Sequence, residues 1–297
     1  MNSIAPITSA PDTHIPRLQQ RLEEGLRQLR GLLSTLGTQS KPEQIHDIRI
    51  ATRRLAVLCR FLSVGPQVSA SFQDLELPLK ELTKTLSAVR SWDVSTQRLK
   101  GLERHWRGEG RPGIGFLRKI LKQQDRRVRR KCMDDFPKDQ YCQDLDPHEL
   151  APAWDSLSVS GLDQDLHDKV RKFTKRVLKK WENYQKSQDI NDLHRLRIGL
   201  KKLRYFLEIE DSCFEHLEEK RIKQLKSVQA RLGYIHDLHV LQGHLEKKAI
   251  RKKVPKGKKA RYHQVQKYLD KSLALALKDF HRGGGTRLPL LLQGDHL

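Results

Sequence analysis

Hydrophobic residues recur every three or four positions along most of this chain. Successive residues of an α-helix are turned by about 100°, so positions three, four and seven apart share one face. The clearest apolar stripes are Ile48, Leu55, Leu58 and Leu62, and Leu196, Leu203, Phe206 and Leu207. No convincing alternation with a period of two and no hairpin signal occurs. The pattern therefore predicts an all-α fold.

The periodic segments fall into two sets of about five helices. The first set is predicted at 16–36, 42–64, 68–90, 92–107 and 112–132, and the second at 162–187, 190–210, 214–235, 237–253 and 256–282. Ser40, Pro42 and Glu43 resemble a capping box at the start of one helix. Asp189 is placed to cap its counterpart in the second set.

Two segments lie outside these sets. Residues 136–161 hold three prolines among many Asp and Ser residues, which is typical of a linker. Three glycines open the tail, 283–297, whose apolar Leu-Pro-Leu-Leu-Leu run either docks on the helices or frays.

One motif occurs twice, 148 residues apart. His46, Arg49, Arg53 and Arg54 have the same spacing as His194, Arg197, Lys201 and Lys202. A second pair of segments, 79–94 and 225–240, matches at a separation of 146 residues and aligns Lys80 with Lys226, Arg90 with His236 and Ser91 with Asp237. Near-equal offsets indicate duplication of a whole helical unit. We therefore expect two pseudo-symmetric bundles, 14–135 and 162–282, that form a single domain over 14–282.

The charge of the chain points to a polyanionic partner. It has 58 Lys and Arg against 36 Asp and Glu, a formal net charge of +22. Residues 111–131 carry nine of these cations and one acid, and residues 247–261 carry nine and no acid. Such a balance suits nucleic acid, anionic lipid or polyphosphate. No apolar run of about 18 residues and no signal peptide is found, and the four cysteines form no Cys-x-x-Cys pair, so we expect a cytoplasmic protein without a membrane span.

Cations repeated along a helix suit a chain of phosphates, because arginine donates two parallel N–H bonds to phosphate and lysine acts as a point charge. Arg118, Lys122, Arg126 and Arg130 recur every four residues, and Lys172, Arg176 and Lys179 form a shorter ridge. The candidate anion-binding residues are His46, Arg49, Arg53, Arg54, Arg60, Lys80, Arg90, Arg118, Lys122, Arg126, Arg130, Lys172, Arg176, Lys179, His194, Arg197, Lys201, Lys202, Lys226 and His236. Arg49, Arg53, Arg197 and Lys201 are expected to contribute most of the affinity, helped by His46 and His194.

Some of these residues keep two interpretations. Lys80, Lys226, Arg90 and His236 either join the anion site or lie on solvated faces. Asp237 either holds a neighbouring cation or caps the next helix, and only capping also suits its counterpart Ser91.

The order of the two motifs resembles the conserved histidine α-helical domain family, CHAD. Its pattern is similar to His-x-x-Arg-x-x-x-Arg-Arg-Leu followed by Leu-Gly-x-x-Arg/Asn-Asp-x-x-Val, each present twice. Leu232, Gly233, Asp237 and Val240 fit the later motif, whereas Ser87 and Ser91 replace its glycine and aspartate in the first half. The resemblance covers 14–282. It implies two related helical bundles around a basic surface or channel, and binding of inorganic polyphosphate.

Two other functions match part of the sequence. His-Asp dipeptides at 46, 167 and 236 resemble part of a metal-dependent phosphohydrolase, but such a site needs further acids, and the surroundings here are cationic. A nucleic-acid-binding protein, in particular an RNA-binding one, fits the charge, although single-strand binders add aromatic platforms, and Tyr205 is the nearest aromatic residue to the basic face.

We therefore predict a non-catalytic polyphosphate-binding protein with no metal or cofactor. Sulfate or phosphate ions would occupy the same sites in a crystal. Targeting to cytoplasmic polyphosphate granules is one purpose consistent with this function. Binding of nucleic acid remains the alternative.

Overall fold

The computed structural model describes residues 14–63, 66–106, 114–157, 159–214 and 219–293. Within these ranges the chain is helical and no strand occurs, which confirms the all-α prediction. No helix in these ranges is both long and apolar enough to cross a membrane. The helices are α1 (His14–Ser34), α2 (Pro42–Leu62), α3 (Pro66–Thr85), α4 (Ser87–His105), α5 (Gly115–Asp134), α6 (Lys138–Asp144), η2 (Pro147–Leu150), α7 (Ala151–Asp155), α8 (Val159–Ser187), α9 (Ile190–Phe214), α10 (Glu219–Glu246), α11 (Lys248–Arg251), η3 (Lys256–Lys258), α12 (Lys259–Asp279), η4 (Phe280–Gly285) and α13 (Leu288–Gln293).

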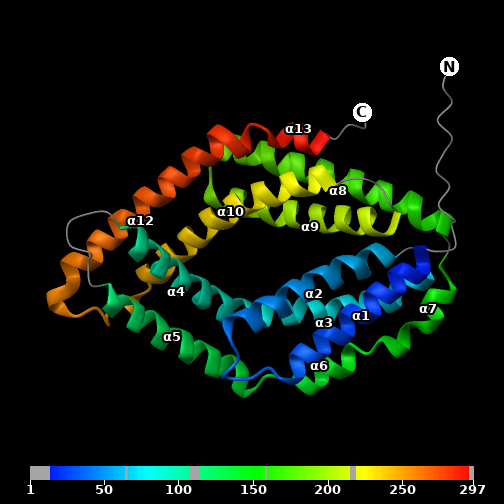
Figure 1. Ribbon diagram of the computed structural model, residues 1–297, viewed down its shortest axis with the longest axis horizontal. Coiled ribbons are helices and arrows are strands. Elements are labelled where there is room, and N and C mark those ends of the chain that lie inside the picture. The colour runs from blue at the N-terminus through cyan, green and yellow to red at the C-terminus, as the bar shows by residue number, and fades with distance from the viewer. Residues whose placement is uncertain (1–13, 64–65, 107–113, 158, 215–218, 294–297) are drawn as a thin grey trace.

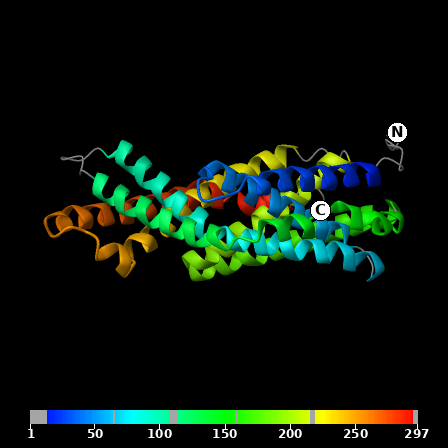
Figure 2. The ribbon, with the colours of Figure 1, turned by 90° about the horizontal axis from the view of Figure 1, so that it is seen from below.

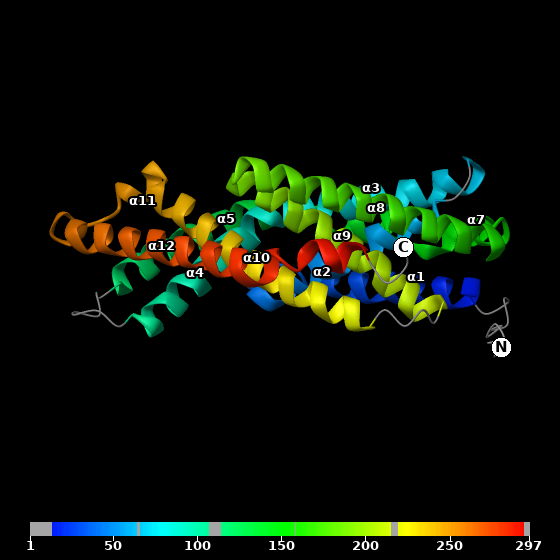
Figure 3. The ribbon, with the colours of Figure 1, turned by 90° about the horizontal axis from the view of Figure 1, so that it is seen from above.

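The molecule is elongated, with two groups of helices side by side (Figure 1). One group contains α1, α2, α3, α6 and α7, and the other contains α8, α9, the first part of α10 and α13. Beyond them, α4, α5, α11, α12 and the end of α10 extend to one end of the molecule (Figures 1, 2 and 3). This end is called the distal arm below.

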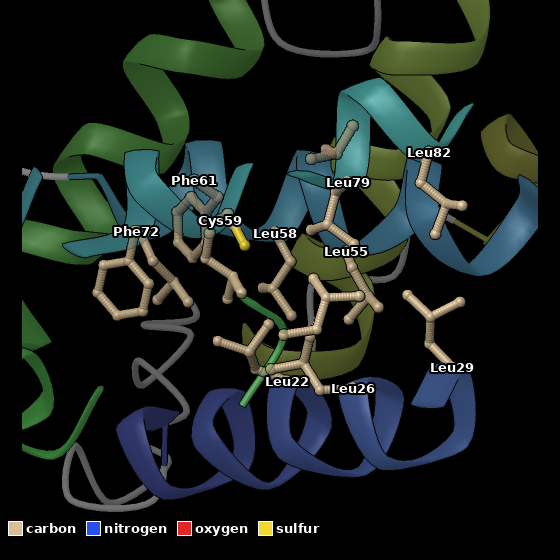
Figure 4. Close-up of a cluster of buried hydrophobic side chains, with 14 of the residues drawn as sticks. Leu22, Leu26, Leu29, Leu55, Leu58, Cys59, Phe61, Phe72, Leu79 and Leu82 are labelled. Atoms are coloured by element: carbon tan, nitrogen blue, oxygen red, sulfur yellow. The ribbon is translucent and has the colours of Figure 1, made fainter. Parts of the chain in front are cut away.

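The core of the first group forms because α1 presents one apolar stripe. Leu18, Leu22, Leu26, Leu29 and Leu33 are spaced by three or four residues, and all are fully buried. The stripe packs against the buried faces of α2 and α3, as Figure 4 shows for part of the cluster. Burying one such leucine contributes about 1.5–3 kcal/mol.

A third core joins the two halves of the sequence. In the distal arm, Trp92, Leu99 and Leu102 of α4 and the apolar face of α5 pack with Leu238, Leu241 and Leu245 of α10 and with residues of α11 and α12. The expected arrangement of two bundles therefore differs from the observed one, which has three cores. The reason is that α4 and α10 each carry apolar residues far beyond the helices of their own half.

Two predicted helix boundaries were wrong. A turn at Leu86 separates α3 from α4, five residues before the expected break, and the Thr83 carbonyl there accepts hydrogen bonds from Ser87 Oγ and from Arg49. The break expected near residue 236 does not occur, because α10 runs from Glu219 to Glu246 with one continuous buried stripe.

The segment expected to be a linker, 136–161, contains α6, η2 and α7. Tyr141, Leu145, Ala153 and Trp154 of this segment are buried in the first core. Proline at the start of η2 and of α7 is compatible with a helix start, so the prolines that suggested a linker lie where they begin short helices instead.

Local caps gave one error and one success. Ser40 does not cap α2; its hydroxyl accepts the Gly37 amide at 2.9 Å, and Lys41 occupies the cap position. Asp189 does cap α9, with its carboxylate accepting the Asn191 amide at 2.6 Å. The glycines of the tail continue α12 as the π-helical turn η4, and α13 docks through buried Leu288 and Leu292.

Candidate anion-binding site

The two copies of the basic motif face one cavity. α2 and α9 lie side by side in the middle of the molecule (Figure 1), and a cavity of about 680 Å³ lies between them and parts of α3, α4 and α10. The predicted residues that line it are His46, Arg49, Arg53, Arg60, Lys80, Arg90, His194, Arg197, Lys201, Lys202 and His236. Residues from both motif copies therefore converge on a common volume.

Two carboxylates line this cavity, and both are already paired. Glu76 of α3 is buried and forms ion pairs with Arg60 and with Lys80, the latter at 2.9 Å. Asp237 of α10 binds Arg98 of α4 at 2.9 Å. Within the described part of the chain, no carboxylate lies within ion-pair distance of the six other Lys and Arg residues that line the cavity. One of the six, Arg49, hydrogen-bonds to Thr83 and Ser87 instead. The other five, called the five unpaired cations below, are Arg53, Arg90, Arg197, Lys201 and Lys202.

Burial and repulsion between neighbouring cations lower the pKa of cavity lysines. Burial, followed by the nearby Arg197 and Arg53, lowers the pKa of its ammonium to about 7. The same causes lower the pKa of Lys202, where burial comes first and Arg60 second. An anion in the cavity would reverse this effect, because an opposite charge favours the charged form.

Arg49 and Arg197 occupy matching motif positions but have different partners. Arg49 is buried and donates to the Thr83 carbonyl and to Ser87 Oγ, the latter at 2.8 Å, so it ties α2 to the turn between α3 and α4. At the position that matches Ser87, Gly233 offers Arg197 no hydroxyl; a Cβ there would lie 3.9 Å from Arg197 Nε. The Nε atom of Arg197 is buried without a hydrogen-bond partner.

The cavity histidines are neutral at neutral pH. The rings of His194 and His236 stack with centroids 4.3 Å apart. Burial, together with Arg197, lowers the pKa of His236 to about 3, and burial followed by Arg197 lowers that of His194. For His46, burial and Arg90 lower the pKa. A neutral imidazole still donates one hydrogen bond, so each ring can contact a phosphate oxygen without adding charge.

The crossing of α4 and α10 explains the substitution of Ser91 for aspartate. Asp237 pairs with Arg98, whereas Ser91 bonds to His244 Nε2 at 3.1 Å. Positions 98 and 244 are again 146 residues apart. The charged pair Arg98–Asp237 therefore corresponds, in the repeat, to the neutral pair Ser91–His244. Of the two interpretations of Asp237, the structure supports the one in which it holds a cation; Asp237 does not cap a helix, because α10 does not begin there.

Nine predicted residues lie outside this cavity. Arg54 is exposed and lies 3.9 Å from Glu208, beside a separate groove bounded by α1, and Lys226 lies 3.6 Å from the same carboxylate. Four are on α5, where Arg118 pairs with Glu103 at 3.1 Å, and three are on α8. The residues on these two helices are Arg118, Lys122, Arg126, Arg130, Lys172, Arg176 and Lys179. The regular spacing of these residues predicted that they share one face of a helix, but it did not indicate whether that face lines the cavity.

Several site residues were missed from the sequence. Glu76 precedes Lys80 by four residues, a spacing that favours helical ion pairs and was a usable signal. Thr83, Ser87 and Arg98 carried no such signal, because their contacts join different helices.

Comparison with known proteins identifies the family and the fold of the chain. The family model described as the CHAD domain matches residues 18–246. The chain is also similar to the crystal structure of the CHAD domain from the plant Ricinus communis, with a TM-score of 0.63, 19% sequence identity and coverage of 96% of this chain and 91% of that one. No curated protein matches the sequence.

Proposed function

Since the chain belongs to the CHAD domain family, we propose that it binds inorganic polyphosphate in the cavity between α2 and α9. The observation that carries this proposal is the cluster of five unpaired cations, which come from both copies of the motif. Holding like charges together in a partly buried site is unfavourable, and a bound polyanion removes that cost.

The shape of the site favours a chain over a single small anion. Arg53 and Arg197 lie within reach of each other's charge, whereas Lys202 is affected by Arg60 and Lys80. Arg49 and Arg60, eleven residues apart on α2, both line the cavity and span roughly 16 Å of helix. Several successive phosphates of one chain can therefore meet cations along this length.

The chemistry proposed here is binding without a reaction. The histidines and the arginines orient and neutralise phosphate oxygens, and the proposal requires no metal or other cofactor. We place this activity in the cytoplasm, in association with polyphosphate granules. After incubation with the protein, polyphosphate of defined length should keep its length distribution on a gel; shortened chains would contradict binding without catalysis.

A titration tests the site itself. Arg53→Ala combined with Lys201→Ala should weaken binding of polyphosphate of defined length by at least about tenfold, because two cations leave the cavity. Arg195→Ala is the matched control, since Arg195 is exposed on α9 and paired with Asp192 outside the cavity. Equal affinities of the wild type and the double variant would overturn the proposal.

The same titration addresses the alternative partner. Single-stranded RNA with the same number of charges should displace the polyphosphate probe poorly, because a sugar separates each phosphate of RNA from the next, so that fewer RNA phosphates meet the cations of the cavity at once. If RNA displaces the probe as well as polyphosphate does, the nucleic-acid interpretation is favoured instead.

A further inference from the structure

A second basic surface lies on the distal arm, away from the cavity. α5 and the segment 247–261 belong to the same core there, through Leu117 and Leu121 on one side and Ile250 and Val254 on the other. Figures 1 and 3 show α5 and α11 at the same end of the molecule. The two most basic stretches of the sequence therefore meet in space.

Two side-chain contacts fix the register of the two segments. Lys253 Nζ donates to Gln123 Oε1 at 3.0 Å, and Lys258 Nζ lies 5.4 Å from the centroid of the Phe116 ring. At about 100° per residue, positions 119, 126, 127 and 130 fall within roughly 60° of Gln123 on α5. One exposed strip thus combines Lys119, Arg126, Arg127 and Arg130 with Lys253 and Lys258, and it is called the α5 strip below.

The acids of this arm do not neutralise the strip. Asp125 is turned toward Arg129, and Glu103 pairs with Arg118, both on the opposite side of α5. The segment 247–261 contains no acid. On α5, the first acid after the last strip residue, Arg130, is Asp134. None of the strip cations forms an ion pair within the described ranges.

We propose that the α5 strip binds the sugar-phosphate backbone of double-stranded nucleic acid, independently of sequence. Its cations are exposed and arranged in two adjacent rows, which suits a broad polyanion better than a single thin chain. The strip cations on α5, from Lys119 to Arg130, span about 16 Å, roughly half of the 34 Å of one duplex turn, so the strip can follow the phosphates along one side of a duplex. A duplex carries about one charge per 1.7 Å, so an exposed cationic strip gains affinity by releasing counterions.

The α5 strip lacks the large exposed hydrophobic side chains with which proteins bind single-stranded nucleic acid or a membrane surface. Among the described residues, the exposed large hydrophobic side chains are Leu77, Ile198, Tyr234, Leu275 and Leu290, none of which is on α5 or in 247–261. Exposed aromatic platforms for stacking single-stranded bases are therefore not found on the strip. Apolar side chains that would insert into a membrane surface are not found there either.

This inference does not depend on the proposed function, and both are tested together. A labelled random-sequence DNA duplex of about two turns serves as one probe, and polyphosphate serves as the other. The strip variant is Lys119→Glu with Arg127→Glu, and the cavity variant is Arg53→Ala with Lys201→Ala. Lys175→Glu with Lys186→Glu, both exposed on α8, is the control with the same change in net charge.

The strip variant should lose about tenfold or more in duplex affinity and retain its polyphosphate affinity. The control and cavity variants should keep duplex affinity within about twofold. A wild type that does not bind duplex at roughly 0.1 M salt would overturn the inference. Equal losses in the strip variant and the control would do so too, because net charge alone would then explain them. Strip-dependent binding to vesicles of anionic lipid, without binding to duplex, would assign the strip to a membrane instead.

Discussion

At the scale of single residues, the surroundings of Arg49 assign it a structural role in addition to its charge. The sequence indicated four main contributors to affinity, but Arg49 donates into the turn between α3 and α4, while Arg53, Arg197 and Lys201 have no such partners. The difference arises from Ser87, which faces Arg49 where Gly233 faces Arg197.

Arg49→Ala should therefore destabilise the protein more than Arg197→Ala does. Removing Arg49 takes away two hydrogen bonds that a charged group donates, to the Thr83 carbonyl and to Ser87 Oγ, and a hydrogen bond of this kind contributes about 1.5–3 kcal/mol, whereas removing Arg197 relieves repulsion. Urea unfolding of the two variants measures the difference. If both variants unfold at the same urea concentration, the hydrogen bonds of Arg49 do not contribute to stability.

Lys201 should make polyphosphate binding depend on pH. Its pKa is about 7 in the free protein, against an ordinary 10.5, and a bound anion raises it again. Above pH 7 the free ammonium has lost its proton and binding must return it, so affinity should fall as pH rises through and above 7. Below pH 7 this contribution is fully present.

Calorimetry in buffers of different ionisation enthalpy, about one unit above the pKa of Lys201, should show proton uptake on binding. Lys201→Arg is the control. This variant should show little proton uptake, because a guanidinium is already protonated before the anion binds. Wild-type binding without proton uptake would be inconsistent with this role.

The same pKa makes a contribution to folding of the free protein. Because the folded-state pKa of Lys201 is depressed, the unfolded chain binds more protons between pH 7 and 10.5, and stability should rise with pH across that window. Without ligand, the cationic cavity therefore opposes folding at neutral pH and below.

At the scale of helices, periodicity located most segments but not how they end or meet. The stripe of α1 and the cap at Asp189 were readable because their contacts lie within a few residues. The turn at Leu86 was not readable, because a side chain from α2 takes part in it. The segment 136–161 folds into short helices only because its apolar residues find the first core.

A buried ion pair links α4 to α5. Arg129 donates to Asp93 at 2.7 Å and to the Ser40 carbonyl at 3.0 Å, so it also holds the turn before α2. Burial raises the pKa of Asp93 to about 6 even though Arg129 opposes that rise. The carboxylate therefore depends mainly on this guanidinium for compensation, with a smaller contribution from Arg90.

Arg129→Met should reduce the free energy of unfolding by about 3–5 kcal/mol, because it leaves Asp93 buried and unpaired. Asp93→Asn with Arg129→Met should be less destabilising than the single change, since the more deeply buried of the two carboxylates near Arg129 is then neutral. Chemical denaturation of both variants near neutral pH provides the comparison. A double variant less stable than the single one would show that the pair stabilises the protein for a reason other than charge compensation.

At the scale of the whole molecule, the excess of positive charge gathers in two places that differ in how exposed their cations are. In the cavity the cations are partly buried and unpaired, whereas on the α5 strip they are exposed. The first arrangement is selective through its shape, and the second depends mainly on ionic strength.

Polyphosphate binding to the cavity should fall with salt in proportion to the contacts made. If the five unpaired cations each neutralise one phosphate, the log–log slope should be about −3.5 for a flexible chain. Titration at several salt concentrations measures the slope, and Arg53→Ala should reduce its magnitude by about 0.7. A slope near that of a single contact would mean that the two motif copies do not act on one chain.

The sequence by itself determined the helical class, the repeated basic motif and the excess of positive charge, because helical periodicity and charge are properties of neighbouring residues. Only the tertiary structure decided which cations share a cavity and which remain paired or exposed. It also decided that helices from both halves build a third core. Those outcomes depend on how helices distant in the chain pack, and a side chain on an amphipathic helix cannot specify the partner that its face meets.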